Sequence, residues 1–212
     1  KDKKEKQTAQ ALNMPSQQSW LSKHTDAVCI LALVAFSIIF FINLGDDPLW
    51  AADEQTYSQW AFHMTKTGDY LTPWAYGEIT FWIAKPPLYM WLMSLSYQAF
   101  GVSNFSSRLI SPIFGILTLI MVFYLGKTLF NRKVGFNAAL VLGTFMTFFS
   151  FARHAMTDVP FVLFIASSIY FFVLSQKDEA KVKRYSALSG VFFGLALMTK
   201  QIQAFLLPLI IV

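Results

Sequence analysis

Long apolar runs separated by short polar segments constrain this chain more than any other feature of its sequence. In chain order, the runs cover about residues 27–45, 105–130, 134–152, 159–175 and 185–199, and a further run starts near Ala204. Most come close to the roughly 20 apolar residues that a helix needs to cross a bilayer core of about 30 Å. Hydrophobic residues make up 55% of the chain and charged residues only 14%, a balance that a water-soluble core does not require. The sequence therefore predicts an all-α integral membrane protein with a multi-span helical bundle.

The basic residues lie mostly in the short polar segments, where they act as topology signals. Lysine and arginine number 17 against 12 acidic residues, which gives a net charge of +5. Because this excess follows the segments between apolar runs, it does not indicate a nucleic-acid partner. Residues 1–23 are polar and basic, and we expect a mobile cytoplasmic tail ahead of a membrane domain at 24–212. Since the chain starts at Lys1 and stops at Val212 within an apolar run, we expect the N-terminal portion of a longer protein.

The placement of one short apolar segment, residues 87–101, decides the predicted topology. As a helix of about 14 residues it would reach only about 21 Å, too little to cross a bilayer comfortably. If it lies flat, the positive-inside rule places about 12 of the 17 basic residues in the cytoplasm. If it crosses, the count becomes about 8 inside against 9 outside, which is no bias. The flat arrangement is therefore predicted, and residues 46–104 become a large first outer loop.

The first outer loop contains a helical pattern of its own. Apolar residues recur from Tyr57 to Met64 with the spacing i, i+3, i+4 and i+7. This spacing predicts an amphipathic helix that begins near Asp53 and is closed by Gly68. We expect its aromatic face to rest on the membrane surface or on the spans.

Charged residues of three outer segments would then share one face of the membrane. The segments are the first outer loop, the loop at 151–158 and the turn at 199–203. The candidate residues are Asp53, Glu54, Lys85, Arg153, His154, Asp158 and Lys200. Asp158 is the hardest to explain without a function, because a charge costs on the order of 2.5 to 3.5 kcal/mol at the centre of a spanning helix and less near the interface.

Several of these residues also have simpler interpretations. Asp53 suits the N-cap of the predicted helix, and Glu54 suits its dipole. Lys85 suits an interfacial anchor that reaches the lipid headgroups. Arg153 and His154 suit an ordinary solvated loop. These alternatives stay open for each residue taken alone. Only the co-occurrence of these charged residues on one face of the membrane indicates a functional site.

In combination, the motifs resemble the GT-C membrane glycosyltransferases. The stretches "DEQTYSQWAF", "AKPPLYMW", "FARHAMTDVP" and "GLALMTKQIQAFLLP" look like the branch that includes protein O-mannosyltransferases and lipid A aminoarabinose transferases. The resemblance runs from about Trp50 to Pro208. Two positions depart from the aminoarabinose transferases, since Thr56 stands where they have an arginine and Ala84 where they have a glutamate. We therefore do not expect the donor sugar or the acceptor to transfer from that branch.

The resemblance implies a reaction and a set of roles. A sugar would move from a polyprenyl-phosphate lipid donor to a hydroxyl or phosphate acceptor on a protein, on lipid A or on another glycan, with inversion. Asp53 would be the general base, and Glu54 and Asp158 would be further catalytic carboxylates. Substrate would be bound by Lys85, which holds the donor phosphate, together with Tyr57, Arg153, His154 and Lys200. The branch is regarded as metal-independent, so we expect no cofactor and do not favour a divalent metal.

The same resemblance implies a location, and one alternative function stays open. The protein would be a multi-pass protein of a bacterial-type cytoplasmic (inner) membrane, with membrane lipids around it and the active site on the outer face. The alternative is a transporter or flippase of an anionic lipid-linked sugar, because charges in membrane segments also line transport paths. A transporter is expected to carry its charges near the middle of the membrane. Here the charged residues lie at the ends of the apolar runs, which favours the enzyme.

Overall fold

The structure of the chain is a computed structural model that divides into two compact units, residues 1–32 and 33–212. The residues that it describes are 17–50, 52–80 and 85–201. Ala84 and the apolar run near Ala204 therefore lie outside the described residues. Each unit is considered by itself below.

The first helix, α2 (Gln17–Ser37), carries the described residues of the first unit. It begins at Gln17, inside the segment 1–23 that was predicted as a cytoplasmic tail. A short 3-10 helix, η1 (Ile38–Phe41), follows α2 in the second unit. Regular helix thus stops before Gly45, where the apolar run was predicted to end.

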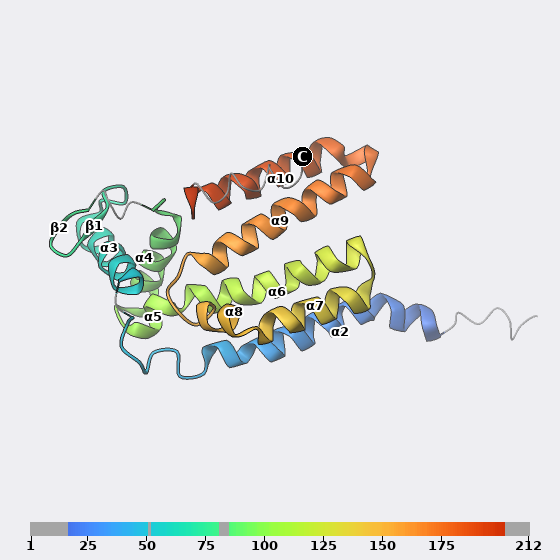
Figure 1. Cartoon of the computed structure of the whole chain (residues 1–212), viewed down its shortest axis with the longest axis horizontal. Coiled ribbons are helices and arrows are strands. Elements are labelled where there is room, and N and C mark those ends of the chain that lie inside the picture. The colour runs from blue at the N-terminus through green and yellow to red at the C-terminus, as the bar shows by residue number, and fades with distance from the viewer. Residues whose placement is uncertain (1–16, 51, 81–84, 202–212) are drawn as a thin grey trace, which may run out of the picture. The chain divides into compact units, whose positions relative to one another are not determined.

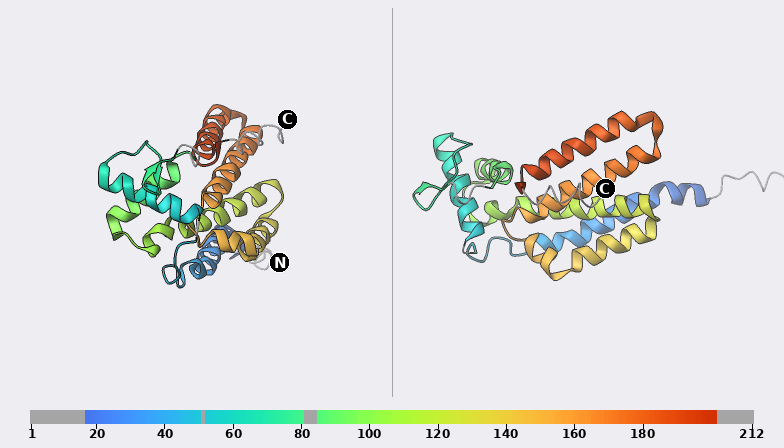
Figure 2. Two further views of the ribbon diagram at one scale, coloured as in Figure 1. Left: turned by 60° about the vertical axis from the view of Figure 1, so that its left-hand side comes forward. Right: turned by 45° about the horizontal axis from the view of Figure 1, so that its top comes forward.

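Four long helices of the second unit form a bundle through pairwise contacts. They are α6 (Ile110–Leu129), α7 (Arg132–Thr144), α9 (Asp158–Lys177) and α10 (Val182–Leu197). Helix α6 packs against α7 and α9, and α9 packs against α10 (Figures 1 and 2). A 3-10 turn, η3 (Glu179–Lys181), connects α9 to α10. Two described stretches, Asn104–Leu129 and Asp158–Lys177, are long and apolar enough to cross a membrane.

Small residues allow α6 and α7 to approach closely. A Cβ atom built on Gly135 would lie 2.4 Å from the Phe123 carbonyl oxygen and 2.7 Å from the Lys127 nitrogen. A Cβ atom on Gly126 would lie 2.7 Å from the Gly135 Cα. Contact between glycines of neighbouring helices is the usual way for apolar helices to maximise their packing. The Asn131 side chain accepts a hydrogen bond from the Val134 N–H and so caps the start of α7.

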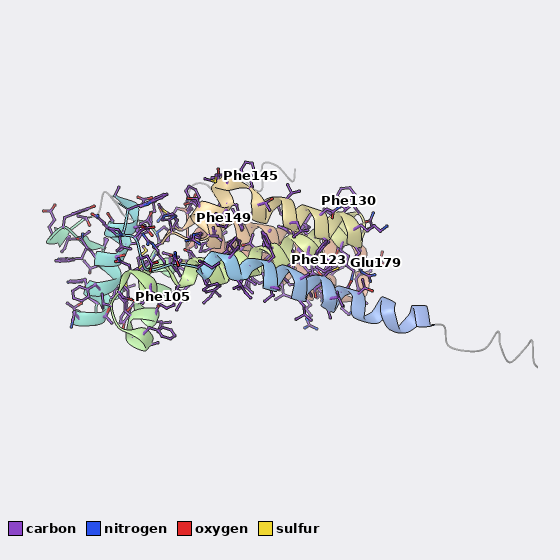
Figure 3. All side chains as sticks on the ribbon, turned by 90° about the horizontal axis from the view of Figure 1, so that it is seen from below. Phe105, Phe123, Phe130, Phe145, Phe149 and Glu179 are labelled. Atoms are coloured by element: carbon purple, nitrogen blue, oxygen red, sulfur yellow. The ribbon has the colours of Figure 1, made fainter. Side chains whose placement is uncertain are left out.

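The apolar run at 134–152 is not one span, contrary to the sequence prediction. Helix α7 ends at Thr144, Phe145 is extended with ψ of 122°, and the short helix α8 (Met146–Phe151) follows. The Thr144 hydroxyl donates to the carbonyls of Leu140 and Val141, which gives the last turn of α7 its hydrogen-bond partners. Phe145 itself is 61% exposed (Figure 3). Gly143 stands two residues before Phe145, but α7 continues through it to Thr144, so the sequence pattern did not reveal the break.

The first outer loop folds into two helices and a hairpin that pack together. Helix α3 (Asp53–Thr67) ends at Gly68, which has φ of 73° and donates its N–H to Met64, as the sequence predicted. Helix α4 (Leu88–Phe100) packs against α3, and the short helix α5 (Asn104–Arg108) leads into α6 (Figure 1).

The hairpin and the apolar face of α3 complete this region. Strands β1 (Trp74–Ala75) and β2 (Glu78–Ile79) are antiparallel and too short to form a true sheet. The apolar residues of α3 contact tyrosine and methionine side chains of α4 and Ala155 in one buried cluster. The amphipathic face of α3 therefore faces protein, not the membrane surface that was one of the two expected partners.

Candidate functional site

Asp53 and Lys85 form the first ion pair of the candidate site. Asp53 is the first residue of α3, and the Lys85 ammonium donates to its Oδ2 at 3.1 Å. The two side chains are 46% and 34% exposed, so solvent or substrate reaches both. Ala52 occupies the N-cap position, with φ of 67°, and no side chain caps the helix. The N-cap interpretation of Asp53 is therefore wrong, and its carboxylate is available for chemistry.

Asp158 and Lys200 form a second ion pair. Asp158 begins α9, and Lys200 follows the end of α10. The Lys200 ammonium donates to Asp158 Oδ1 at 2.7 Å, and both side chains are half-buried. The contact between α9 and α10 brings these residues together although 42 positions separate them.

Tyr57 contacts the first ion pair. Lys85 donates a hydrogen bond to the Tyr57 hydroxyl, and its ammonium lies 5.1 Å from the centre of the ring. Burial raises the pKa of Tyr57, and the negative charges of Asp53 and Asp158 raise it further. The phenol therefore stays protonated at physiological pH. The two ion pairs and Tyr57 together are called the polar centre.

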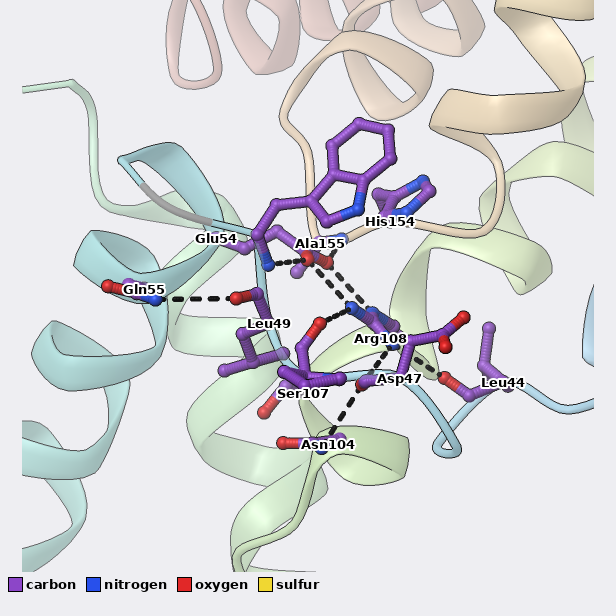
Figure 4. Close-up of polar contacts among 12 residues, drawn as sticks. Leu44, Asp47, Leu49, Glu54, Gln55, Asn104, Ser107, Arg108, His154 and Ala155 are labelled. Carbon is purple, nitrogen blue, oxygen red and sulfur yellow. Dashed lines mark hydrogen bonds and ion pairs between the residues drawn. The ribbon is translucent and has the colours of Figure 1, made fainter.

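Glu54 has surroundings that differ from those of its neighbour Asp53. Its side chain is fully buried, and Arg108, 3% exposed, donates from Nε to Oε1 at 3.0 Å and from Nη2 to Oε2 at 2.9 Å (Figure 4). The backbone N–H groups of Trp50 and Ala155 also donate to this carboxylate. Burial alone would raise the pKa of Glu54, but these hydrogen bonds, first of all those from Arg108, lower it overall. Glu54 is thus a buried anion whose two oxygens accept four hydrogen bonds, and its catalytic role stays a prediction.

Arg108 extends this network to the chain before α3. Its guanidinium also donates to the backbone carbonyls of Leu44, Asp47 and Pro48 (Figure 4). One arginine therefore holds the segment 44–48, the start of α3 and, through Glu54, the loop at Ala155. Sequence reasoning used Arg108 only as a topology signal. The sequence feature that could have indicated a buried partner for Arg108 is its position, as a lone arginine, at the start of a long apolar run.

Arg153 and His154 precede Asp158 closely in the sequence, but they contact residues outside the polar centre. Arg153 donates to the Ile39 carbonyl at 2.9 Å and lies over the Phe149 ring. The His154 Nδ1 lies 2.7 Å from the Ser150 carbonyl, and its ring lies against the Trp50 ring, with centroids 3.5 Å apart and an interplanar angle of 30°. Among the described residues, the hydrogen bond of His154 goes to Ser150 and not to Asp158. In the described part of the chain, no three histidine, cysteine or acidic side chains come together as a metal site would require.

Comparison with known proteins relates this arrangement to a family. Residues 84–212, more than half of the chain, match the family described as dolichyl-phosphate-mannose-protein mannosyltransferase. An uncharacterised protein of Aquifex aeolicus is 32% identical over 180 residues, which cover 84% of this chain and 35% of that protein. The undecaprenyl phosphate-alpha-4-amino-4-deoxy-L-arabinose arabinosyl transferase of Yersinia enterocolitica is 30% identical over 184 residues, which cover 85% of this chain and 33% of that protein.

A solved structure shares the fold. The crystal structure of ArnT from Cupriavidus metallidurans bound to undecaprenyl phosphate is similar with a TM-score of 0.76 at 21% identity. The similarity covers 84% of this chain and 34% of that one. The chain thus spans about a third of the length of the curated relatives that it matches.

Proposed function

Because the chain belongs to the dolichyl-phosphate-mannose-protein mannosyltransferase family, we propose that it contributes the active site of a polyprenyl-phosphate-sugar glycosyltransferase. The observation that carries this proposal is the polar centre, which consists of two carboxylate–lysine pairs and Tyr57. Its lysines suit an anionic phosphate and its carboxylates suit proton removal, which are the two requirements of this transfer. The named activity of the Yersinia enterocolitica relative and the ligand of the Cupriavidus metallidurans structure support the same donor class.

Lys85 and Lys200 are proposed to bind the donor phosphate. Breaking the bond between the anomeric carbon and the phosphate oxygen leaves negative charge on the lipid phosphate and positive charge on the sugar ring. A charge-assisted hydrogen bond from an ammonium stabilises the departing phosphate. When Lys85 turns to the phosphate, its bond to Asp53 weakens, and the carboxylate becomes free to accept a proton.

Asp53 is proposed to act as the general base. The acceptor oxygen attacks the anomeric carbon from the face opposite the phosphate, its proton passes to the Asp53 carboxylate, and the polyprenyl phosphate leaves. This sequence inverts the anomeric centre. Asp158, which is paired with Lys200, is proposed to orient the sugar or the phosphate together with that lysine. We propose no metal in this scheme.

The proposal names the class of the donor lipid but leaves the identity of the donor sugar to experiment. Thr56 is buried, and its hydroxyl lies 3.0 Å from the Tyr76 hydroxyl of the hairpin. A threonine in this contact leaves no cationic group where the aminoarabinose transferases have an arginine. We therefore propose a panel test with mannosyl and aminoarabinosyl donors, in which protein, lipid A and glycan acceptors are compared.

We propose that the protein is a multi-pass protein of a bacterial-type inner membrane with this polar centre on the outer face. Helix α4 has 13 residues and packs on α3, which supports its placement outside the membrane. Asp158 is the first residue of α9 and Lys200 follows the end of α10, so neither lies in the middle of a helix. This distribution favours an enzyme over a transporter. The test uses the full-length protein in nanodiscs with radiolabelled polyprenyl-phosphate sugars; movement of the lipid without any sugar transfer would favour transport.

Replacing Lys85 with alanine is expected to weaken donor binding by about 10-fold or more, because one charge-assisted contact to the phosphate is lost. The apparent affinity for a polyprenyl-phosphate sugar, measured in nanodiscs, checks this. Lys85→Arg is expected to recover part of the affinity but not all of it, since the guanidinium differs in size and geometry. Lys66→Ala, a second lysine of the first outer loop, is the matched control. Unchanged donor affinity in Lys85→Ala would contradict the phosphate role.

A further inference from the structure

The hairpin of the first outer loop holds one tyrosine in a backbone conformation that tyrosine rarely adopts. Strands β1 and β2 pair Ala75 with Glu78, so Tyr76 and Gly77 form a two-residue turn. Both residues have positive φ angles, 55° for Tyr76 and 85° for Gly77, as a type I′ turn requires. Asparagine, aspartate and glycine are the residues that favour the first of these two positions. For a bulky side chain a positive φ is an outlier, and such outliers concentrate at functional sites.

Contacts that do not involve the Tyr76 side chain attach the hairpin to α3. The Trp74 ring of β1 stacks on His63 of α3, with centroids 4.6 Å apart and an interplanar angle of 11°. The backbone N–H of Tyr76 donates to the Gln59 side chain at 2.7 Å, a bond that any residue except proline could make. Strand β1 packs along α3 as a result (Figure 1). What the tyrosine adds to this turn is therefore its ring and its hydroxyl.

The Tyr76 hydroxyl meets α3 close to the polar centre. It lies 3.0 Å from the Thr56 hydroxyl. Thr56 follows Asp53 by three residues, so the two side chains lie on the same face of α3, about one turn apart. Thr56 also precedes Tyr57, whose hydroxyl accepts the hydrogen bond of Lys85. The pair of hydroxyls therefore lies about one helical turn from the proposed base.

The two side chains of this hydroxyl pair differ in burial. Thr56 is 4% exposed, whereas Tyr76 is 52% exposed. Each hydroxyl carries one hydrogen and two lone pairs. Since a buried hydroxyl needs a partner for its hydrogen, Thr56 is best satisfied by donating to Tyr76, which leaves the tyrosine O–H for a ligand. The tyrosine thus offers an accessible aromatic face and a hydroxyl donor together.

We propose that Tyr76 contacts the sugar of the lipid donor, an inference that rests on the proposed function. The transferred sugar is joined to the phosphate held by Lys85, and the acceptor reaches its anomeric carbon beside Asp53. The sugar ring must therefore lie next to the first turns of α3, where the Thr56–Tyr76 pair lies. An aromatic ring packs against the C–H face of a sugar, and a phenol donates to a sugar hydroxyl. Because the pair carries no charge, Tyr76 is a specificity-determining residue that favours a sugar hydroxyl over a charged substituent.

The test compares the affinities of three lipids for the full-length protein in nanodiscs. They are undecaprenyl-phosphate mannose, undecaprenyl-phosphate aminoarabinose and undecaprenyl phosphate without a sugar. Tyr76→Asn suits the turn better than the native tyrosine, so folding is expected to be retained. This variant is expected to bind the sugar-bearing lipid that the wild type prefers about 10-fold more weakly, because a ring contact and a hydrogen bond are lost. Binding of undecaprenyl phosphate is expected to stay unchanged, whereas Lys85→Ala is expected to weaken binding of all three lipids.

A second pair of variants isolates the hydroxyl. Tyr76→Phe keeps the ring and removes the hydroxyl, so it is expected to show a smaller loss for the same sugar-bearing lipid and none for undecaprenyl phosphate. Tyr70→Phe is the matched control, because Tyr70 is a 37% exposed tyrosine of the same loop whose hydroxyl accepts a hydrogen bond from Gln98. It is expected to bind all three lipids as the wild type does.

Three results would overturn the inference while sugar transfer by the wild type still supports the proposed function. The first is wild-type affinity of Tyr76→Asn for both sugar-bearing lipids. The second is an equal loss of affinity for all three lipids in this variant, which would indicate a structural role for the tyrosine. The third is a wild-type protein that binds neither sugar-bearing lipid more tightly than undecaprenyl phosphate. A wild-type protein that transfers sugar from no donor would instead overturn the proposed function, and this inference with it.

Discussion

The variant Asp53→Asn is expected to lower the turnover number of sugar transfer by about 10²- to 10⁴-fold, the usual contribution of a general base. The asparagine side chain keeps the size of the carboxylate and still offers an oxygen to Lys85, so the ion-pair geometry is largely retained. It cannot take the proton of the acceptor. Donor binding is therefore expected to change little, and the loss should appear in turnover and not in affinity for the lipid donor.

Single-turnover transfer and donor binding, measured on the same nanodisc preparation, check this division. Asp69→Asn is the matched control, because Asp69 is an exposed carboxylate of the same loop that only accepts hydrogen bonds from the turn at Leu71 and Thr72. It is expected to retain transfer. If Asp53→Asn kept wild-type turnover, the base would have to be another group, and Asp158 would be the next residue to replace.

The variant Arg108→Met is expected to lower the free energy of unfolding by about 3 to 5 kcal/mol, since removal of one partner leaves a buried charge unpaired. The charge concerned is Glu54, which is fully buried among four hydrogen bonds from Arg108, Trp50 and Ala155. Arg108 also holds three backbone carbonyls of the segment 44–48. Their loss should loosen the chain directly before Asp53, so turnover is expected to fall together with stability.

Denaturation in detergent micelles, followed by circular dichroism, measures the change in stability. The double variant Glu54→Leu with Arg108→Met is expected to recover part of the loss, because it removes both buried charges. Lys181→Met, which removes only a surface pair with Asp178, is the control and should change stability little. A single variant as stable as wild type would show that the buried pair does not hold this region.

The same ion pair makes the stability depend on pH. The pKa of Glu54 is lower in the folded protein than its ordinary value of 4.5, so the folded state binds its proton less readily than the unfolded state. Its contribution to stability is therefore complete above about pH 4.5 and is lost as the pH falls through the folded pKa. Glu54→Gln is expected to remove this part of the acid dependence. Identical acid profiles for wild type and Glu54→Gln would contradict the assignment.

Local sequence patterns were sufficient to predict the helices whose formation depends on residues close together in the chain. The helix of the first outer loop was predicted from Asp53 to Gly68 because apolar spacing and a terminating glycine are properties of a few adjacent residues. The apolar runs at 105–130 and 159–175 were predicted for the same reason, and α6 and α9 confirm them as helices. The motifs that carry the family resemblance were likewise visible in the sequence.

The sequence by itself determined the helical class, the family and the set of charged residues, because apolar periodicity and short motifs are local properties. Only the tertiary structure decided which charges pair. Asp53 meets Lys85, Asp158 meets Lys200, and Glu54 turns inward to Arg108, 54 positions away. Adjacent residues of a helix point about 100° apart, so the two carboxylates of the "DE" pair face different surroundings. The packing around α3 decided that Glu54 is buried and Asp53 is exposed. The break at Phe145 is likewise accompanied by tertiary contacts, such as the packing of Phe148 on Phe40, which the local sequence does not specify.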